Sequence, residues 1–99
     1  MAAGTLNSEL PKGGVGLSGG FKLHVISVTA PVGTSQTSFT ITVDGVTTES
    51  RICGVIPVES TAADLGVVYV TPTANTLTIG FASQNLAGTE TFHIAYQTR

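Results

Sequence analysis

Residues 13–20, GGVGLSGG, contain two overlapping patterns that could serve chemistry. Residues 14–19 match the G-x-G-x-x-G of dinucleotide-binding loops, and residues 16–20 match the G-x-S-x-G around a hydrolase nucleophile, which would be Ser18. Both patterns work at a turn that follows a strand and opens a helix. Here an aperiodic polar stretch precedes the segment and a β-type run follows it. We therefore predict a pliable glycine-rich connector, with neither a cofactor site nor a catalytic serine.

The potential metal ligands do not form a set. His24 and His93 each lie in the middle of a β-type run, and Cys53 is the single cysteine. A zinc site needs several nitrogen, sulfur or carboxylate ligands that converge, so we predict no metal. We expect the histidines on a solvent-facing or subunit-facing sheet surface, where they can respond to a pH of about 6 to 7. We expect Cys53 to be an inert, buried thiol.

The acidic residues give no catalytic pair. Asp44 fits a turn and Asp64 a helix cap, and Glu49 can pair with Arg51 for less than about 1 kcal/mol. Glycoside hydrolysis needs two carboxylates that converge in a cleft, and a chain of 99 residues has little room for one. We therefore expect no catalytic residues, no cofactor and no enzymatic activity.

Composition narrows the range of partners. The chain is 41% apolar and only 10% charged, against about 25% charged in an average domain. Its four basic residues are scattered, which argues against nucleic acid as a partner. No apolar run approaches the ~20 residues of a membrane-spanning helix, and the N-terminus lacks the features of a secretory signal. The single cysteine fits synthesis in a reducing host cytoplasm.

The chain divides near residue 20. Residues 1–20 lack periodicity and are predicted to form a flexible or extended arm, whereas residues 21–99 consist of short β-type runs separated by turn signals. The connections are too short for crossover helices, so the pairing must be largely antiparallel. We predict an all-β domain, a single antiparallel β-sandwich or jelly-roll-like barrel of about seven strands. The expected strands cover residues 21–29, 38–44, 46–52, 55–58, 66–71, 75–83 and 89–97.

Alternation within the runs predicts which side chains face the core. The inward residues are Phe39, Ile41, Val43, Leu77, Ile79, Phe81, Phe92, Ile94 and Tyr96. Asp44-Gly45 predicts a type I′ hairpin that pairs Val43 with Val46 and Ile41 with Thr48. Residues 61–66 predict one helical turn, with Thr61 and Asp64 as a capping pair and Gly66 at its end.

The scarcity of charge points to assembly. Exposed sheet edges with few charged residues are prone to aggregation unless another subunit covers them. An extended arm of this length can reach tens of ångströms and add main-chain pairing to a neighbour's sheet. We expect the interface to use apolar residues of the arm and threonines of the strand faces: Leu6, Leu10, Pro11, Val15, Leu17, Thr40, Thr42 and Thr48.

In this combination of an arm over residues 1–20 and threonine-rich runs such as SFTITVDGVTTES, the chain resembles small β-rich accessory proteins of tailed bacteriophage virions. It is most similar to the decoration or cement proteins that attach to capsids. The resemblance implies a jelly-roll or related β-fold and a homo-oligomer, with a trimer favoured.

Two hypotheses of function follow. In the first, the chain is a non-enzymatic virion structural protein that stabilises a capsid by contacts with the major capsid protein or another virion protein. In the second, it is a receptor- or glycan-binding module of a phage tail or fibre, whose loop residues Gln36, Asn75 and Gln84 contact the ligand.

Overall fold

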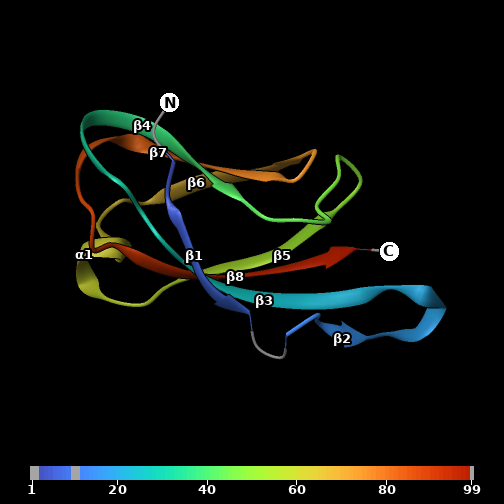
Figure 1. Cartoon of the computed structure of the whole chain (residues 1–99). Coiled ribbons are helices and arrows are strands. Elements are labelled where there is room, and N and C mark those ends of the chain that lie inside the picture. The colour runs from blue at the N-terminus through green and yellow to red at the C-terminus, as the bar shows by residue number, and fades with distance from the viewer. Residues whose placement is uncertain (1–2, 10–11, 99) are drawn as a thin grey trace.

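Two antiparallel sheets packed face to face form the protein (Figure 1). The computed structural model describes residues 3–9 and 12–98, without the side chains at positions 61, 68, 83 and 84. The five-stranded sheet has the order β1-β3-β8-β5, with β2 also paired to β3, and the three-stranded sheet has the order β4-β7-β6. The strands are β1 (Thr5–Glu9), β2 (Val15–Gly16), β3 (Lys22–Thr29), β4 (Val32–Thr42), β5 (Arg51–Pro57), β6 (Val67–Thr73), β7 (Thr76–Ala87) and β8 (Thr91–Thr98).

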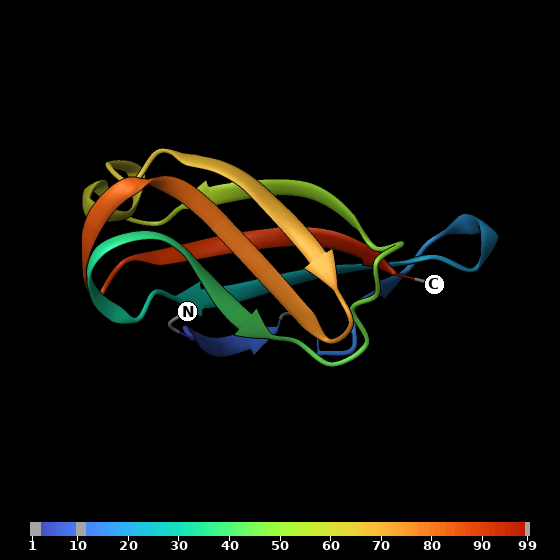
Figure 2. The same ribbon diagram turned by 90° about the horizontal axis from the view of Figure 1, so that it is seen from above.

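The predicted all-β sandwich is confirmed. The described residues form eight strands, where the sequence predicted about seven, and the two sheets remain separate layers instead of closing into a barrel. Figure 2 shows β6, β7 and β4 lying across the strands of the other sheet. The molecule measures 42 × 23 × 19 Å.

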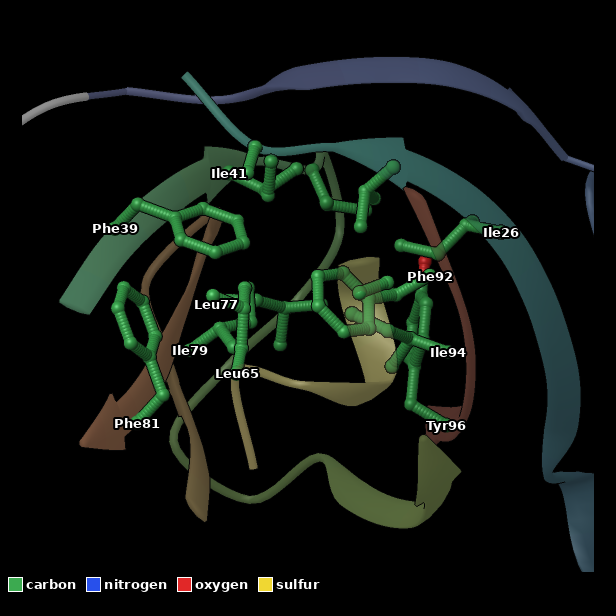
Figure 3. Packing of buried hydrophobic residues seen from close by; sticks show 14 of the residues in the cluster. Ile26, Phe39, Ile41, Leu65, Leu77, Ile79, Phe81, Phe92, Ile94 and Tyr96 are labelled. Atoms are coloured by element: carbon green, nitrogen blue, oxygen red, sulfur yellow. The ribbon is translucent and has the colours of Figure 1, made fainter. Parts of the chain in front are cut away.

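The core lies between the sheets, and its residues come from strands that alternate as predicted. Phe39 and Ile41 of β4, Leu77 and Ile79 of β7, and Phe92 of β8 are all fully buried. Figure 3 shows these side chains pointing toward one another from both layers. Burying an aliphatic or aromatic side chain of this size stabilises the fold by about 1.5–3 kcal/mol. The alternation of apolar and polar residues therefore fixes which face of each strand points inward.

The N-terminal segment belongs to the chain's own sheet. β1 pairs antiparallel with β3, with a bulge between Leu6 and Ser8. Just before it, the Gly4 N–H donates to the Thr40 carbonyl of β4 at 2.7 Å. In Figure 1, β1 accordingly runs from beside β4 down to β3. The main-chain pairing that the sequence assigned to a neighbouring subunit is made here within one molecule, and it covers the open edge of β3.

The glycine-rich segment forms a hairpin with β3. β2 pairs with the beginning of β3, and the 3₁₀ turn η1 (Ser18–Gly20) connects them. The Leu17 N–H donates to the Phe21 carbonyl at 2.7 Å, and Gly19 and Gly20 take positive φ angles of 84° and 83° that glycine adopts without strain. Figures 1 and 2 both show this hairpin projecting from one end of the sandwich. The segment predicted as a pliable connector is thus a hairpin, and no helix follows its glycines.

The turn at Asp44-Gly45 is present, but the hairpin predicted around it is wrong. Gly45 has a φ of 90°, and the Val46 N–H donates to the Val43 carbonyl. β4 nevertheless pairs with β7, so that Ile41 lies opposite Leu77 and not opposite Thr48. After the turn the chain crosses to the other sheet, where β5 pairs with β8. Pairing with β7 places the inward residues of β4 against the core. This packing involves residues far apart in the sequence, so the local turn motif does not predict it.

The helical turn expected near residue 61 is confirmed, but its capping pair is not. The helix α1 (Ser60–Ala63) follows Glu59, and Asp64 is the residue at its C-terminal end. Asp64 therefore cannot act at the N-terminus as predicted. Gly66 ends the turn with a φ of 60° and donates its N–H to the Ala63 carbonyl, in agreement with the prediction.

Candidate functional site

The strongest polar cluster joins β1, β3 and β8. The His24 Nδ1 atom lies 2.5 Å from Oε2 of Glu9, and its Nε2 atom lies 2.8 Å from the Thr98 hydroxyl oxygen. The imidazole stacks on the Tyr96 ring at 4.8 Å between centroids. The other Glu9 oxygen accepts the Gly13 N–H at 2.9 Å. The cluster therefore fastens the N-terminal strand to the centre of the five-stranded sheet.

The hydrogen bonds define where the protons lie. A carboxylate only accepts, so Nδ1 of His24 must carry the proton that points at Glu9. In a neutral imidazole, Nε2 accepts the Thr98 hydroxyl proton, and in a charged one it donates to that oxygen. The cluster thus stays fully hydrogen-bonded in both protonation states of the ring.

The cluster shifts the pKa of two of its members. Partial burial raises the pKa of Glu9, but the Gly13 N–H, the His24 hydrogen bond and the His24 charge together lower it below its ordinary 4.5. Burial, with a smaller contribution from the Glu9 charge, raises the pKa of Tyr96 to about 12. Glu9 is therefore held as a carboxylate and Tyr96 as a neutral phenol.

The order hydroxyl, imidazole, carboxylate is also that of a nucleophilic triad. In this protein the three groups stand on three different strands of one sheet, and Tyr96 covers one face of the imidazole. A surface hollow adjoins the cluster and is lined by Leu6, Asn7, Lys12, His24, Val43 and Tyr96, among others. The hydrogen bonds of His24 with Glu9 and with Thr98 tie β1, β3 and β8 together.

Sequence reasoning missed this cluster because no pattern links its members. It placed both histidines on an outward sheet surface, which holds for the exposed His93 but not for His24, whose side chain is 13% exposed. Cys53, expected to be buried, is exposed. The bulge between Ile52 and Gly54 in β5 shifts the strand's alternation at this point.

The residues predicted for the interface lie in separate places. Leu6, Val15 and Leu17 are exposed on β1 and the projecting hairpin. Thr40 and Thr42 lie on the outer face of the three-stranded sheet, and Thr48 lies in the loop between β4 and β5. Leu10 and Pro11 fall outside the described residues. No single surface contains all the described members of the set.

The outer face of the five-stranded sheet carries exposed apolar side chains. Val15 is 45% exposed, Val25 37% and Ile56 64%. Val15 pairs with Leu23, Val25 with Ala95, and Ile56 lies one diagonal step away, opposite His93. We call Val15, Leu23, Val25, Ala95 and Ile56 the apolar face. His93 lies at the border of this face, opposite Ile56.

The outer face of the three-stranded sheet is hydroxyl-rich. Register places Thr42, Thr76 and Thr73 in one rank across β4, β7 and β6, and Thr40, Thr78 and Thr71 in the next. We call these six residues the threonine face. Figure 2 looks onto the outer side of the three-stranded sheet. No residue of the three strands is charged or is a histidine.

The loop residues suggested for ligand contact do not gather. Gln36 and Gln84 are cross-strand partners on β4 and β7, whereas Asn75 lies at the opposite end of this sheet, in the turn between β6 and β7. The Asn75 side chain accepts the Gly45 N–H at 3.0 Å. Asn75 therefore has a structural role in joining two turns.

The described residues contain no group of three or more His, Cys, Asp or Glu side chains placed to hold a metal ion. Within the same part of the chain, no helix has the length and apolar character needed to cross a membrane. Comparisons with protein-family models, with curated proteins and with solved structures find no match to this chain.

Proposed function

We propose that this chain is a non-enzymatic structural protein of a bacteriophage virion that decorates and stabilises the shell. In this proposal it is made in the host cytoplasm, associates with copies of itself, with a trimer favoured, and binds the major capsid protein or another virion protein. The observation that carries the proposal is the apolar face of the five-stranded sheet. Three of its side chains, Val15, Val25 and Ile56, are exposed on a chain with very few charges.

The β1 pairing changes the way in which docking would occur. Because β1 already pairs with β3, it does not extend away from the domain as an arm that could enter a neighbour's sheet. The contact would instead be made by side chains, and the projecting β2–β3 hairpin extends the surface with Val15 and Leu17. Burial of apolar area by a partner supplies about 25 cal/mol for each Å² removed from water.

Contact with shells tests the proposal directly. Virus shells assembled without this chain are mixed with the purified protein and pelleted, and the native mass of the free protein is measured. We expect co-sedimentation and an oligomer. The double variant Val25→Lys, Ile56→Lys should lose both properties, because two charges would have to be desolvated at the contact.

Thr71→Lys is the control, since it adds a lysine to an exposed position on the opposite sheet. It should pellet with shells as the unmodified chain does. Thermal unfolding of each variant verifies that the sandwich is intact. A monomer that never pellets with shells, or loss of pelleting by Thr71→Lys alone, would overturn the proposal.

A further inference from the structure

Tyr69 lies flat over Gly80 on the outer face of the three-stranded sheet. The two residues are register partners on β6 and β7. A Cβ atom added at Gly80 would stand 2.1 Å from both Cε2 and Cζ of the Tyr69 ring. The ring therefore occupies the space above the glycine, and one of its faces rests on the backbone. With half of its surface exposed, the residue presents its other face to solvent.

Hydroxyl groups border this ring on the threonine face. Thr78 and Thr71 form the rank next to Gly80 and Tyr69, and they pair with each other across β7 and β6. In the next cross-strand pair, the Thr73 hydroxyl donates to the Thr76 carbonyl and the Thr76 hydroxyl donates to the Ala74 carbonyl. Across the described residues, the hydroxyls of Thr71 and Thr78 have no hydrogen-bond partner, so they remain available to a ligand.

We propose that Tyr69, Thr71 and Thr78 form a binding site for a neutral polysaccharide. A pyranose ring has an apolar C–H face and a rim of hydroxyls. The C–H face would stack on Tyr69, as apolar groups do on aromatic faces. The rim would exchange hydrogen bonds with threonine hydroxyls, which both donate and accept.

The electrostatics of the sheet select among carbohydrates. β4, β6 and β7 contain no basic side chain to pair with a carboxylate or sulfate, and no acidic one to pair with an amine. Binding a charged sugar here would remove its charge from water without compensation. The complementary ligand is therefore an uncharged polymer of hexose or pentose units.

This site is independent of the proposed docking surface, because the apolar face and the threonine face lie on opposite sheets. A shell-bound copy would keep the polysaccharide site turned outward. If the protein does not bind shells, the polysaccharide proposal still stands. If it binds no polysaccharide, the proposal of shell binding still stands.

Affinity electrophoresis through gels that contain soluble β-glucan, xylan, mannan or the anionic polymer alginate tests the site. We expect at least one neutral polymer to retard the protein and alginate to leave its mobility unchanged. Tyr69→Ala should weaken binding about tenfold or more, a loss typical of a central aromatic contact. Tyr69→Phe keeps the ring and should bind within about threefold. Val58→Ala, at an exposed position that belongs to neither the apolar face nor the threonine face, is the control and should not change retardation.

Three results would overturn the proposal. The first is no retardation by any neutral polymer, and the second is equal retardation of the unmodified protein and Tyr69→Ala. The third is a concentration-dependent dimer that Tyr69→Ala abolishes, because it would assign the threonine face to a second copy of this chain. Circular dichroism of Tyr69→Ala establishes that the variant is folded.

Discussion

Nδ1 of His24 and Oε2 of Glu9 lie 2.5 Å apart, and this contact fastens β1 to β3. β1 is an edge strand in which four of five residues are exposed, so few apolar contacts hold it in place. Its attachment to the sheet depends on main-chain pairing, on this side-chain bond and on the Asn7 amide, which donates to the Thr29 hydroxyl oxygen at 2.7 Å. The Glu9 carboxylate is therefore one of the groups that set the free energy of local opening of the N-terminus.

Glu9→Gln is expected to loosen β1 and to leave the sandwich intact. The amide keeps the size of the carboxylate but loses the charge that His24 and the Gly13 N–H both recognise. We expect the amide hydrogens of residues 5–9 to exchange about tenfold faster, because a hydrogen bond to a charged group contributes about 1.5–3 kcal/mol. Exchange in β7 should be unchanged, and Glu49→Gln, in an exposed turn, is the control. Equal exchange in Glu9→Gln and the unmodified protein would contradict the role assigned to the pair.

Glu90→Gln is expected to destabilise the fold at neutral pH and to have little effect in acid. Glu90 is 4% exposed, and its oxygens accept the N–H groups of Ala87 and Gly88 at 3.0 and 3.1 Å. Burial raises the Glu90 pKa, but backbone N–H groups outweigh this and hold the pKa below 4.5. A lowered folded-state pKa contributes stability that is present above the unfolded value and lost as pH falls through the folded one.

Chemical denaturation at two pH values measures this difference. The free energy of unfolding of Glu90→Gln should be lower by about 1–3 kcal/mol at pH about 7, since the amide NH₂ would face a backbone donor. Near pH 2, where the natural side chain is itself protonated, the difference should largely disappear. A deficit of the same size at both pH values would show that charge at position 90 is irrelevant.

Tyr96 is expected to make the fold sensitive to alkali. Burial raises its pKa to about 12, whereas the ordinary pKa of a tyrosine in an unfolded chain is 10.0. Between these values the unfolded chain has lost the proton that the folded one retains, so stability falls as pH rises. The expected fall is roughly 2–3 kcal/mol.

Two phenylalanine variants separate this effect from general alkaline unfolding. Tyr96→Phe cannot ionise and should remove most of the fall in the free energy of unfolding above pH about 10. Tyr69→Phe, at an exposed tyrosine, should leave the fall in place. If both variants behave alike, Tyr96 is not the titrating group.

Gly80→Ala is expected to destabilise the fold through its collision with Tyr69. The new Cβ would lie 2.1 Å from two ring atoms, so the ring must leave its position. The cost should shrink in the Tyr69→Ala background, where no ring is present. A double-mutant cycle on the free energy of unfolding should give a coupling of about 0.5–3 kcal/mol. Additive effects would mean that the two residues do not touch in solution.

Cys53 is expected to react with a thiol reagent in the native protein. Its side chain is exposed, and its one described hydrogen bond is to the Arg51 carbonyl at 3.9 Å. Titration with a chromogenic disulfide should therefore modify the native thiol within about tenfold of the rate in denaturant. Reaction that begins only on unfolding would place Cys53 in the interior, as its sequence context suggested.

The layers of the sandwich follow from local patterning, whereas the order of the strands does not. Phe39 and Ile41 alternate with threonines, and the structure buries the former and turns the latter outward. The same pattern cannot state that β4 pairs with β7, because strand pairing depends on contacts across the core. The Asp44-Gly45 signal correctly marked a turn and wrongly implied that the chain doubles back on itself.

The N-terminal region contains a strand that the sequence pattern does not predict. Residues 5–9 have no apolar alternation, since the edge strand they form has most side chains in solvent. Sequence reasoning therefore interpreted them as an arm. The Glu9–His24 contact spans 15 positions, and no helical or strand period connects its ends. Tyr69 over Gly80 was equally hidden, because its geometry depends on the register of β6 with β7.

The lack of charge in β4, β6 and β7 has a consequence for how the protein meets its surroundings. Mobile ions weaken attraction between exposed charges beyond a Debye length of about 8–10 Å near physiological ionic strength. Salt therefore has little effect on binding to a surface that has no formal charges. Binding of a neutral polysaccharide to this sheet is expected to be equally strong at low and at high salt concentration.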